Sequence, residues 1–147
     1  MATARLLTVH PRPDQALRNF SIAEKMALTV EISLSYLRVR WLMRRGDFRA
    51  TLAAVRRTDA APSSCAPLFP NRLGGIVEAR LGLLPGDTRC LARSLVLVRL
   101  LARRGLSCTF VIGVRTEPDF GAHAWVELDG HPLLNPIEAA GSRLIEL

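Results

Sequence analysis

The amino-acid sequence predicts one α+β domain, with helices first, a buried helix in the middle and an antiparallel sheet at the end. Three observations lead to this prediction. Apolar residues recur at helical spacing in the first third of the chain, the segment Cys90 to Leu101 is strongly apolar, and β-branched residues with short turns fill the C-terminal part. The order of helices before strands is typical of the α+β class.

The 147 residues suffice for one hydrophobic core but hardly for two. We therefore expect a single domain that covers residues 1–147. It should consist of a helical N-terminal part (1–58), a proline-rich loop (59–75) and a catalytic core of helix and sheet (76–147).

The first helix is predicted from Ser21 to about Arg45. Ser21 and Glu24 have the spacing of a capping box, in which the two side chains bind backbone N–H groups at the start of a helix. Gly46 ends this helix, and Phe48 to Arg57 predicts a second one. The two helices should form a hairpin.

The stretch Ala60 to Pro70 holds three prolines and two serines, which predicts a loop. A short helix is expected over Gly75 to Leu83. A turn at residues 85–87 then leads into the buried helix, Cys90 to Leu101, which Arg103 to Gly105 close.

Three strands are predicted after the buried helix. They cover Cys108 to Val114, Ala122 to Leu128 and Pro132 to Asn135, with turns at residues 116–119 and at Asp129 and Gly130. The sequence contains no internal repeat and no low-complexity tract.

The composition limits the classes of function. A net charge of +7 favours an anionic partner such as nucleic acid, a membrane surface or an acidic peptide. Arginines interrupt the apolar stretches, so no membrane span is expected, and the N-terminal residues do not form a secretory signal, which predicts a cytoplasmic protein. Three cysteines without a CxxC pair indicate neither a disulfide framework nor a zinc site, so no metal and no cofactor are expected.

Cys90 is the first candidate for chemistry. It lies in the first turn of the buried helix, where Asp87 or Thr88 can act as the N-cap and where the helix dipole lowers the pKa of a thiol. A buried cysteine with only a packing role is the alternative. The candidate base is His123, 33 residues later on a predicted strand.

A third catalytic residue, Asn135, depends on how the last two strands pair. A three-residue hairpin loop with Gly130 in the left-handed conformation would place Asn135 opposite His123, where its side-chain oxygen could orient the imidazole. A two-residue Asp-Gly turn would instead place it opposite Ala124. We favour the three-residue loop.

An oxyanion would be held by the backbone N–H of Cys90 and by a second donor that the sequence does not identify. The remaining candidates are weaker. Cys65 and Cys108 are expected to be structural, Trp125 lines a substrate groove or packs, and two histidines are expected on the surface, namely His10 and His131.

The segments CLARSLVLVRLLARRG, VIGVR and FGAHAWVELDG resemble the transglutaminase-like leader peptidases of lasso peptide biosynthesis, the microcin J25-processing protein family. The resemblance is strong over Arg89 to Gly130. It implies a transglutaminase-like or papain-like fold, with the nucleophile at Cys90 and the histidine at His123. The family's third residue is an aspartate, and Asn135 stands in its place.

The resemblance further implies hydrolysis of the bond between leader and core of a lasso precursor peptide through a thioester. A leader-recognition protein would assist, here as a separate chain because the helical first part is too short to contain it, and a lasso cyclase would act afterwards. Acyl transfer by the same cysteine and histidine is the alternative. A basic nucleic-acid-binding module is a further alternative, against which the absence of a recognised nucleic-acid motif speaks.

Overall fold

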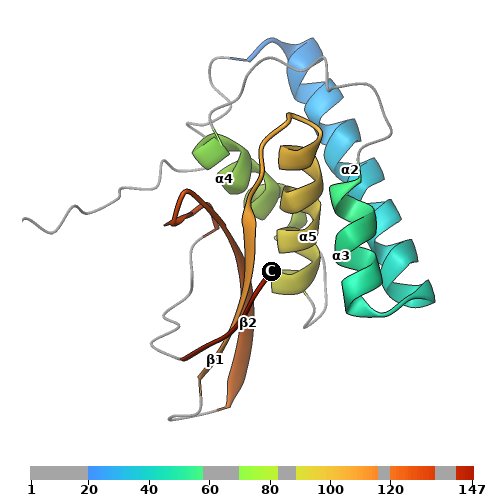
Figure 1. Ribbon diagram of the computed structural model, residues 1–147. Coiled ribbons are helices and arrows are strands. Elements are labelled where there is room, and N and C mark those ends of the chain that lie inside the picture. The colour runs from blue at the N-terminus through green and yellow to red at the C-terminus, as the bar shows by residue number, and fades with distance from the viewer. Residues whose placement is uncertain (1–19, 58–69, 83–88, 116–119, 135–141) are drawn as a thin grey trace, which may run out of the picture.

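The computed structural model describes residues 20–57, 70–82, 89–115, 120–134 and 142–147 (Figure 1). Within these ranges helices precede strands, which confirms the α+β prediction. The elements are α2 (Ile22–Arg45), α3 (Phe48–Arg56), α4 (Pro70–Leu81), α5 (Arg89–Ala102), β1 (Thr109–Arg115), β2 (Gly121–Leu128), β3 (His131–Pro132) and β4 (Ser142–Glu146).

Helix α5 is the centre of the fold. It lies between the sheet and the hairpin of α2 and α3 (Figure 1), and it contacts α2, α3, α4 and β2. Its middle turns are fully buried on all sides, from Leu95 to Val98. A helix that is apolar all round needs such a position, because no side of it can face water at low cost. The predicted buried helix packed on an antiparallel sheet is therefore confirmed.

The hairpin of α2 and α3 also agrees with the prediction. The Ser21 hydroxyl accepts a hydrogen bond from the Glu24 N–H at 3.2 Å, and the Glu24 carboxylate accepts one from the Ser21 N–H at 2.8 Å, which completes the capping box. Glu31 ties α2 to the end of α5 through ion pairs with Arg103 at 3.1 Å and Arg104 at 2.9 Å.

Helix α4 begins earlier than predicted. We expected a loop up to residue 75 and a helix from Gly75, whereas the helix starts at Pro70. Proline is favoured at the first helical position, because its missing N–H would have no partner there and its φ already suits the helix. Gly74 then packs so closely on the backbone of Leu133 that a Cβ on Gly74 would overlap with the Leu133 carbonyl oxygen.

The sheet has four strands in the order β3-β2-β1-β4. All described pairs are antiparallel, and β1 and β2 pair along seven residues, with Gly113 opposite His123. Strand β4 was not predicted. Its sequence, SRLIE, is short, and its partner β1 lies far away in the chain.

The predicted register of the last hairpin is wrong. Leu128 pairs with His131, so the loop contains only Asp129 and Gly130, whose φ angles are 50° and 77°. Positive φ at both positions is the signature of a type I′ turn, which suits the twist of a hairpin and which the Asp-Gly pair readily adopts. Strand β3 also ends at Pro132 instead of reaching residue 135. Asn135 itself lies outside the described residues.

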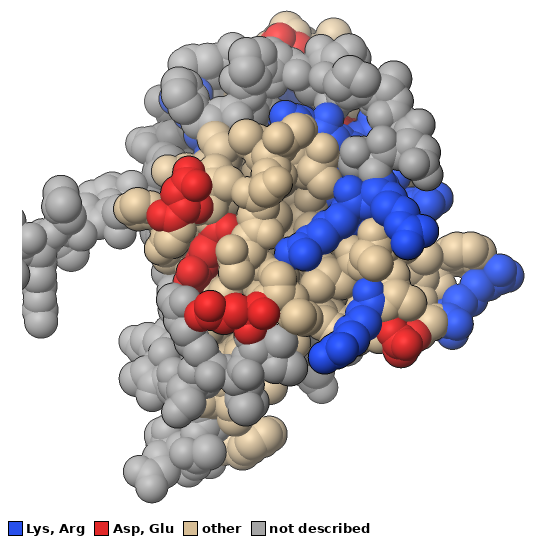
Figure 2. All heavy atoms as spheres, in the orientation of Figure 1, with Lys and Arg blue, Asp and Glu red and all other residues tan. Residues whose placement is uncertain are grey.

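Two surface features stand out. Basic side chains gather on the side of α2 and α3, whereas most acidic side chains in the same view lie on the opposite side (Figure 2). Helix α2 also exposes large apolar side chains on the side away from the core, namely Ile22, Met26, Val30, Leu34, Leu37 and Trp41. In the part of the chain that is described, no helix is long and apolar enough to cross a membrane.

Candidate active site

Cys90 lies in the first turn of α5 and is half-buried. Its thiol forms a hydrogen bond with the side chain of His123, which lies on β2. The two residues that the sequence predicts as a reacting pair are thus in contact. The two candidate N-caps of this helix, Asp87 and Thr88, lie outside the described residues.

The contact depends on how α5 meets the edge of β2. The Leu133 N–H donates to the Val126 carbonyl at 2.9 Å, so the backbone groups of Val126 face the β3 side. Strand alternation turns the backbone groups of Ala124 to the same side. There the Ser94 hydroxyl donates to the Ala124 carbonyl at 2.9 Å, and the Ala124 backbone also forms a hydrogen bond with Cys90.

Cys90 and Ser94 are one helical turn apart and point in the same direction. Together they fasten the first two turns of α5 to the strand at the residue next to His123. Ser94 is fully buried, and its hydroxyl is the side-chain group that links the helix of the cysteine to the strand of the histidine. Ser94 was not predicted to take part in the site. The available signal was its hydroxyl, one helical turn after the cysteine.

The surroundings of Cys90 lower the pKa of its thiol. The largest cause is the hydrogen bond with His123, which burial partly opposes; the backbone of Ala124, the charge of the His123 imidazolium and the backbone of Leu91 act in the same direction as the hydrogen bond. A thiolate is therefore available at lower pH than in an ordinary cysteine, and the thiolate is the nucleophilic form.

Trp125 and Glu127 continue the row of side chains that begins with His123. The rings of His123 and Trp125 stack with centroids 6.1 Å apart and planes inclined by 20°. The Trp125 indole N–H donates to a Glu127 carboxylate oxygen at 2.8 Å. Both Trp125 and Glu127 are buried. Of the two roles considered for Trp125, a groove lining or a packing role, its burial favours packing.

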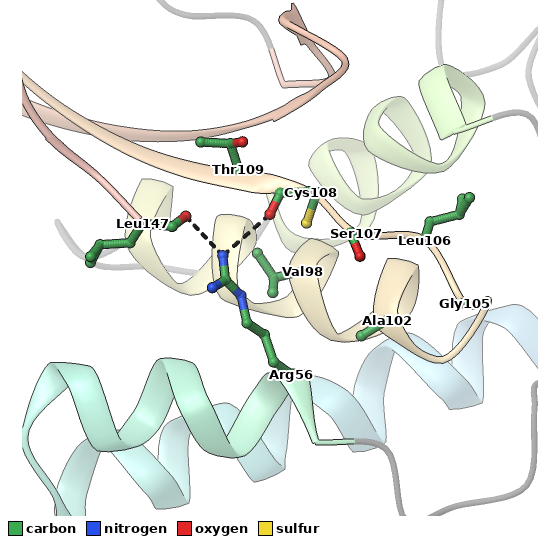
Figure 3. Close-up of a pocket in the computed structure, with 9 residues that line it drawn as sticks. All are labelled: Arg56, Val98, Ala102, Gly105, Leu106, Ser107, Cys108, Thr109 and Leu147. Atoms are coloured by element: carbon green, nitrogen blue, oxygen red, sulfur yellow. Dashed lines mark hydrogen bonds between the residues drawn. The ribbon is translucent and has the colours of Figure 1, made fainter.

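Cys108 has the opposite environment. It lines a cavity of about 460 Å³ beside α3 and the end of α5, in which neither Cys90 nor His123 takes part (Figure 3). The Arg56 side chain spans this cavity and donates to the carbonyls of Cys108 at 3.2 Å and Leu147 at 2.8 Å. Burial raises the pKa of the Cys108 thiol, which fits the structural role expected for it.

Of the remaining candidates, only His131 lies within the described residues. His131 is exposed, and its Nδ1 lies 3.0 Å from the Asp129 carbonyl oxygen. Cys65, His10 and Asn135 lie outside the described residues, so the orienting role of Asn135 stays a prediction without the register that supported it. Among the described residues no group of three or more His, Cys, Asp or Glu side chains could hold a metal ion.

The sequence matches one protein-family model over most of its length. The model of the transglutaminase-like superfamily matches residues 26–143, which is most of the chain and includes both Cys90 and His123. The chain belongs to the transglutaminase-like superfamily. No curated protein and no solved structure matches it.

The α+β architecture is consistent with a transglutaminase-like fold. The helix that bears Cys90 and the strand that bears His123 both lie within the matched residues. Membership also indicates an enzyme of the Cys–His hydrolase or transferase type. The neighbouring pair of thiol and imidazole fits this chemistry.

Proposed function

We propose that the protein is a cysteine peptidase that removes the leader from a ribosomally made lasso precursor peptide. The observation that carries the proposal is the hydrogen bond between the Cys90 thiol, at the start of α5, and His123. The choice of substrate rests on the resemblance of three segments to lasso leader peptidases, namely CLARSLVLVRLLARRG, VIGVR and FGAHAWVELDG.

In the proposed reaction the Cys90 thiolate attacks the carbonyl carbon of the last leader residue. The bond between this carbon and the nitrogen of the first core residue breaks, and the core leaves as an amine that takes a proton from His123. Water then attacks the thioester and gives a proton to His123. The leader departs as a carboxylic acid, and the thiolate of Cys90 is restored.

The reaction needs donors for the oxyanion of each tetrahedral intermediate. The start of α5 offers backbone N–H groups with no partner inside the helix, and we assign the N–H of Cys90 to this task. We further propose that a separate leader-recognition protein presents the precursor, that the protein acts in the cytoplasm, and that no cofactor takes part. A lasso cyclase would take up the released core.

The test is cleavage of a precursor by the purified protein together with its leader-recognition protein, followed by mass spectrometry. We expect wild type to release leader and core. The cleavage rate should fall by about 10³-fold or more in Cys90→Ala and in His123→Ala. Ser33→Ala, an exposed change on α2, is the matched control and should cleave like wild type. Cleavage that survives Cys90→Ala would refute the mechanism.

Acyl transfer is the second candidate, because the superfamily match fits transferases as well as hydrolases. The same thioester would then pass to an amine instead of water. Adding hydroxylamine to the cleavage reaction separates the two cases. A leader that ends in a carboxylic acid without an added amine supports the peptidase, whereas an acyl product that forms only when an amine is supplied supports the transferase.

A further inference from the structure

Glu127 carries a buried carboxyl group that takes no part in the proposed mechanism. Only 6% of its surface is exposed. Its neighbours across the sheet are Thr109 on β1 and Pro132 on β3. A buried carboxyl group is costly unless hydrogen bonds satisfy it, so its place two strand positions after Trp125 requires a reason.

One partner of Glu127 is the indole of Trp125, whose N–H donates to the carboxylate at 2.8 Å. The indole is 4% exposed, and Val111, its neighbour on β1, is fully buried. An indole N–H offers one donor in a fixed direction. The hydrogen bond therefore restricts the side-chain torsions of Trp125, so that the indole ring has a defined orientation.

The other side of the indole meets the imidazole of His123. The near-parallel planes and the separation of 6.1 Å between centroids fall in the range of offset aromatic stacking. The imidazole in turn forms the hydrogen bond with Cys90. Glu127, Trp125, His123 and Cys90 thus form a continuous series of contacts, three members of which lie at alternate positions of β2.

We propose that Glu127 is a positioning residue of the candidate active site: its hydrogen bond to the indole of Trp125 fixes the ring on which His123 stacks and so directs the imidazole to the Cys90 thiol. Glu127 acts through Trp125 and touches no reacting atom. This role rests on the assignment of Cys90 and His123 as the reacting pair, and it is independent of the choice of a leader peptide as substrate.

The test follows the alkylation of Cys90 by iodoacetamide across pH, read by peptide mass spectrometry, so no substrate is needed. Glu127→Leu removes the acceptor, whereas Glu127→Gln keeps an acceptor oxygen. The net strength of one hydrogen bond corresponds to a rate ratio of about five-fold. We expect Glu127→Leu to lower the Cys90 rate at neutral pH by about this factor and to move the midpoint to higher pH. Glu127→Gln should stay within about two-fold of wild type.

Trp125→Phe keeps a ring for stacking but has no N–H, so it should reproduce the shift seen with Glu127→Leu. If both act through one hydrogen bond, the double variant should be no slower than Glu127→Leu alone. Alkylation of Cys108 in the same samples, together with thermal unfolding, reports whether the sheet is intact. Trp125→Phe also provides the test if Glu127→Leu fails to fold.

Three results would overturn the proposal. The first is an unchanged Cys90 profile in folded Trp125→Phe or Glu127→Leu. The second is a loss in Glu127→Gln as large as in Glu127→Leu, and the third is additive effects in the double variant. Either of the last two would mean that Glu127 acts by another route. A failure of this kind would leave precursor cleavage unaffected, so it can be told apart from failure of the peptidase assignment.

Discussion

Cys90 and Cys108 are both partly buried, yet their surroundings act in opposite directions. Cys90 has hydrogen bonds with His123 and with backbone groups, which lower the pKa of its thiol, whereas burial dominates at Cys108 and raises the pKa. The sequence predicted the lowered pKa of Cys90 from its place in the first turn of a helix, and it predicted only a structural role for Cys108. It did not predict the contacts to Ala124, because these depend on where the helix meets the strand edge.

Ser94→Ala tests the link between the two elements of the site. The substitution leaves the Ala124 carbonyl without the Ser94 donor, so we expect a loss of about 1 to 3 kcal/mol in the free energy of unfolding. Chemical denaturation measures it. Ser33→Ala is the control, because the Ser33 hydroxyl donates to its own helix at an exposed site, and it should change stability by less than about 0.5 kcal/mol. Equal effects of the two substitutions would contradict the structural role of Ser94.

At the scale of elements, the helix and the strand that carry the site could be predicted from the sequence, whereas the register of the last hairpin could not. Helix α5 was recognisable because its middle turn, from Leu95 to Val98, is apolar on every side. The Asp-Gly pair allowed two loop lengths, and tertiary contacts decided between them, since Leu133 and Leu134 after the short β3 are buried. Helix α2 is apolar on its core face and again on its exposed face, so its sequence alone could not show which face packs.

Two neighbouring glycines of α4 give a matched test of how this helix packs. A Cβ on Gly74 would overlap with the Leu133 carbonyl, whereas a Cβ on Gly75 would meet nothing within 4 Å. We expect Gly74→Ala to cost about 1 to 3 kcal/mol through overpacking, and Gly75→Ala to stabilise the helix by about 0.5 to 1 kcal/mol. Thermal unfolding compares them. A Gly74→Ala variant as stable as Gly75→Ala would show that α4 does not rest on the segment after β3.

In the whole molecule, the site arises where the central helix meets the sheet. The sequence could predict that both a helix with Cys90 and a strand with His123 exist, because each is a local pattern. It could not predict Ser94 as the connection between them, nor β4 as the second partner of β1, since both depend on residues far apart in the chain. The basic surface is likewise a property of the whole molecule: Lys and Arg side chains gather on the outer layer formed by α2 and α3 (Figure 2).

The central claim is that His123 makes Cys90 a thiolate at a pH where an ordinary cysteine is still protonated. The most direct measurement is the pH dependence of iodoacetamide alkylation, followed for Cys90 and Cys108 in the same samples of wild type and His123→Ala. Because the pKa of Cys90 is lowered and that of Cys108 is raised, the wild-type Cys90 rate should reach its plateau at lower pH and decline only as pH falls through the lowered pKa. In His123→Ala the Cys90 midpoint should move to higher pH while Cys108 stays unchanged. Coincident midpoints in wild type, or a Cys90 midpoint that His123→Ala leaves in place, would contradict the account.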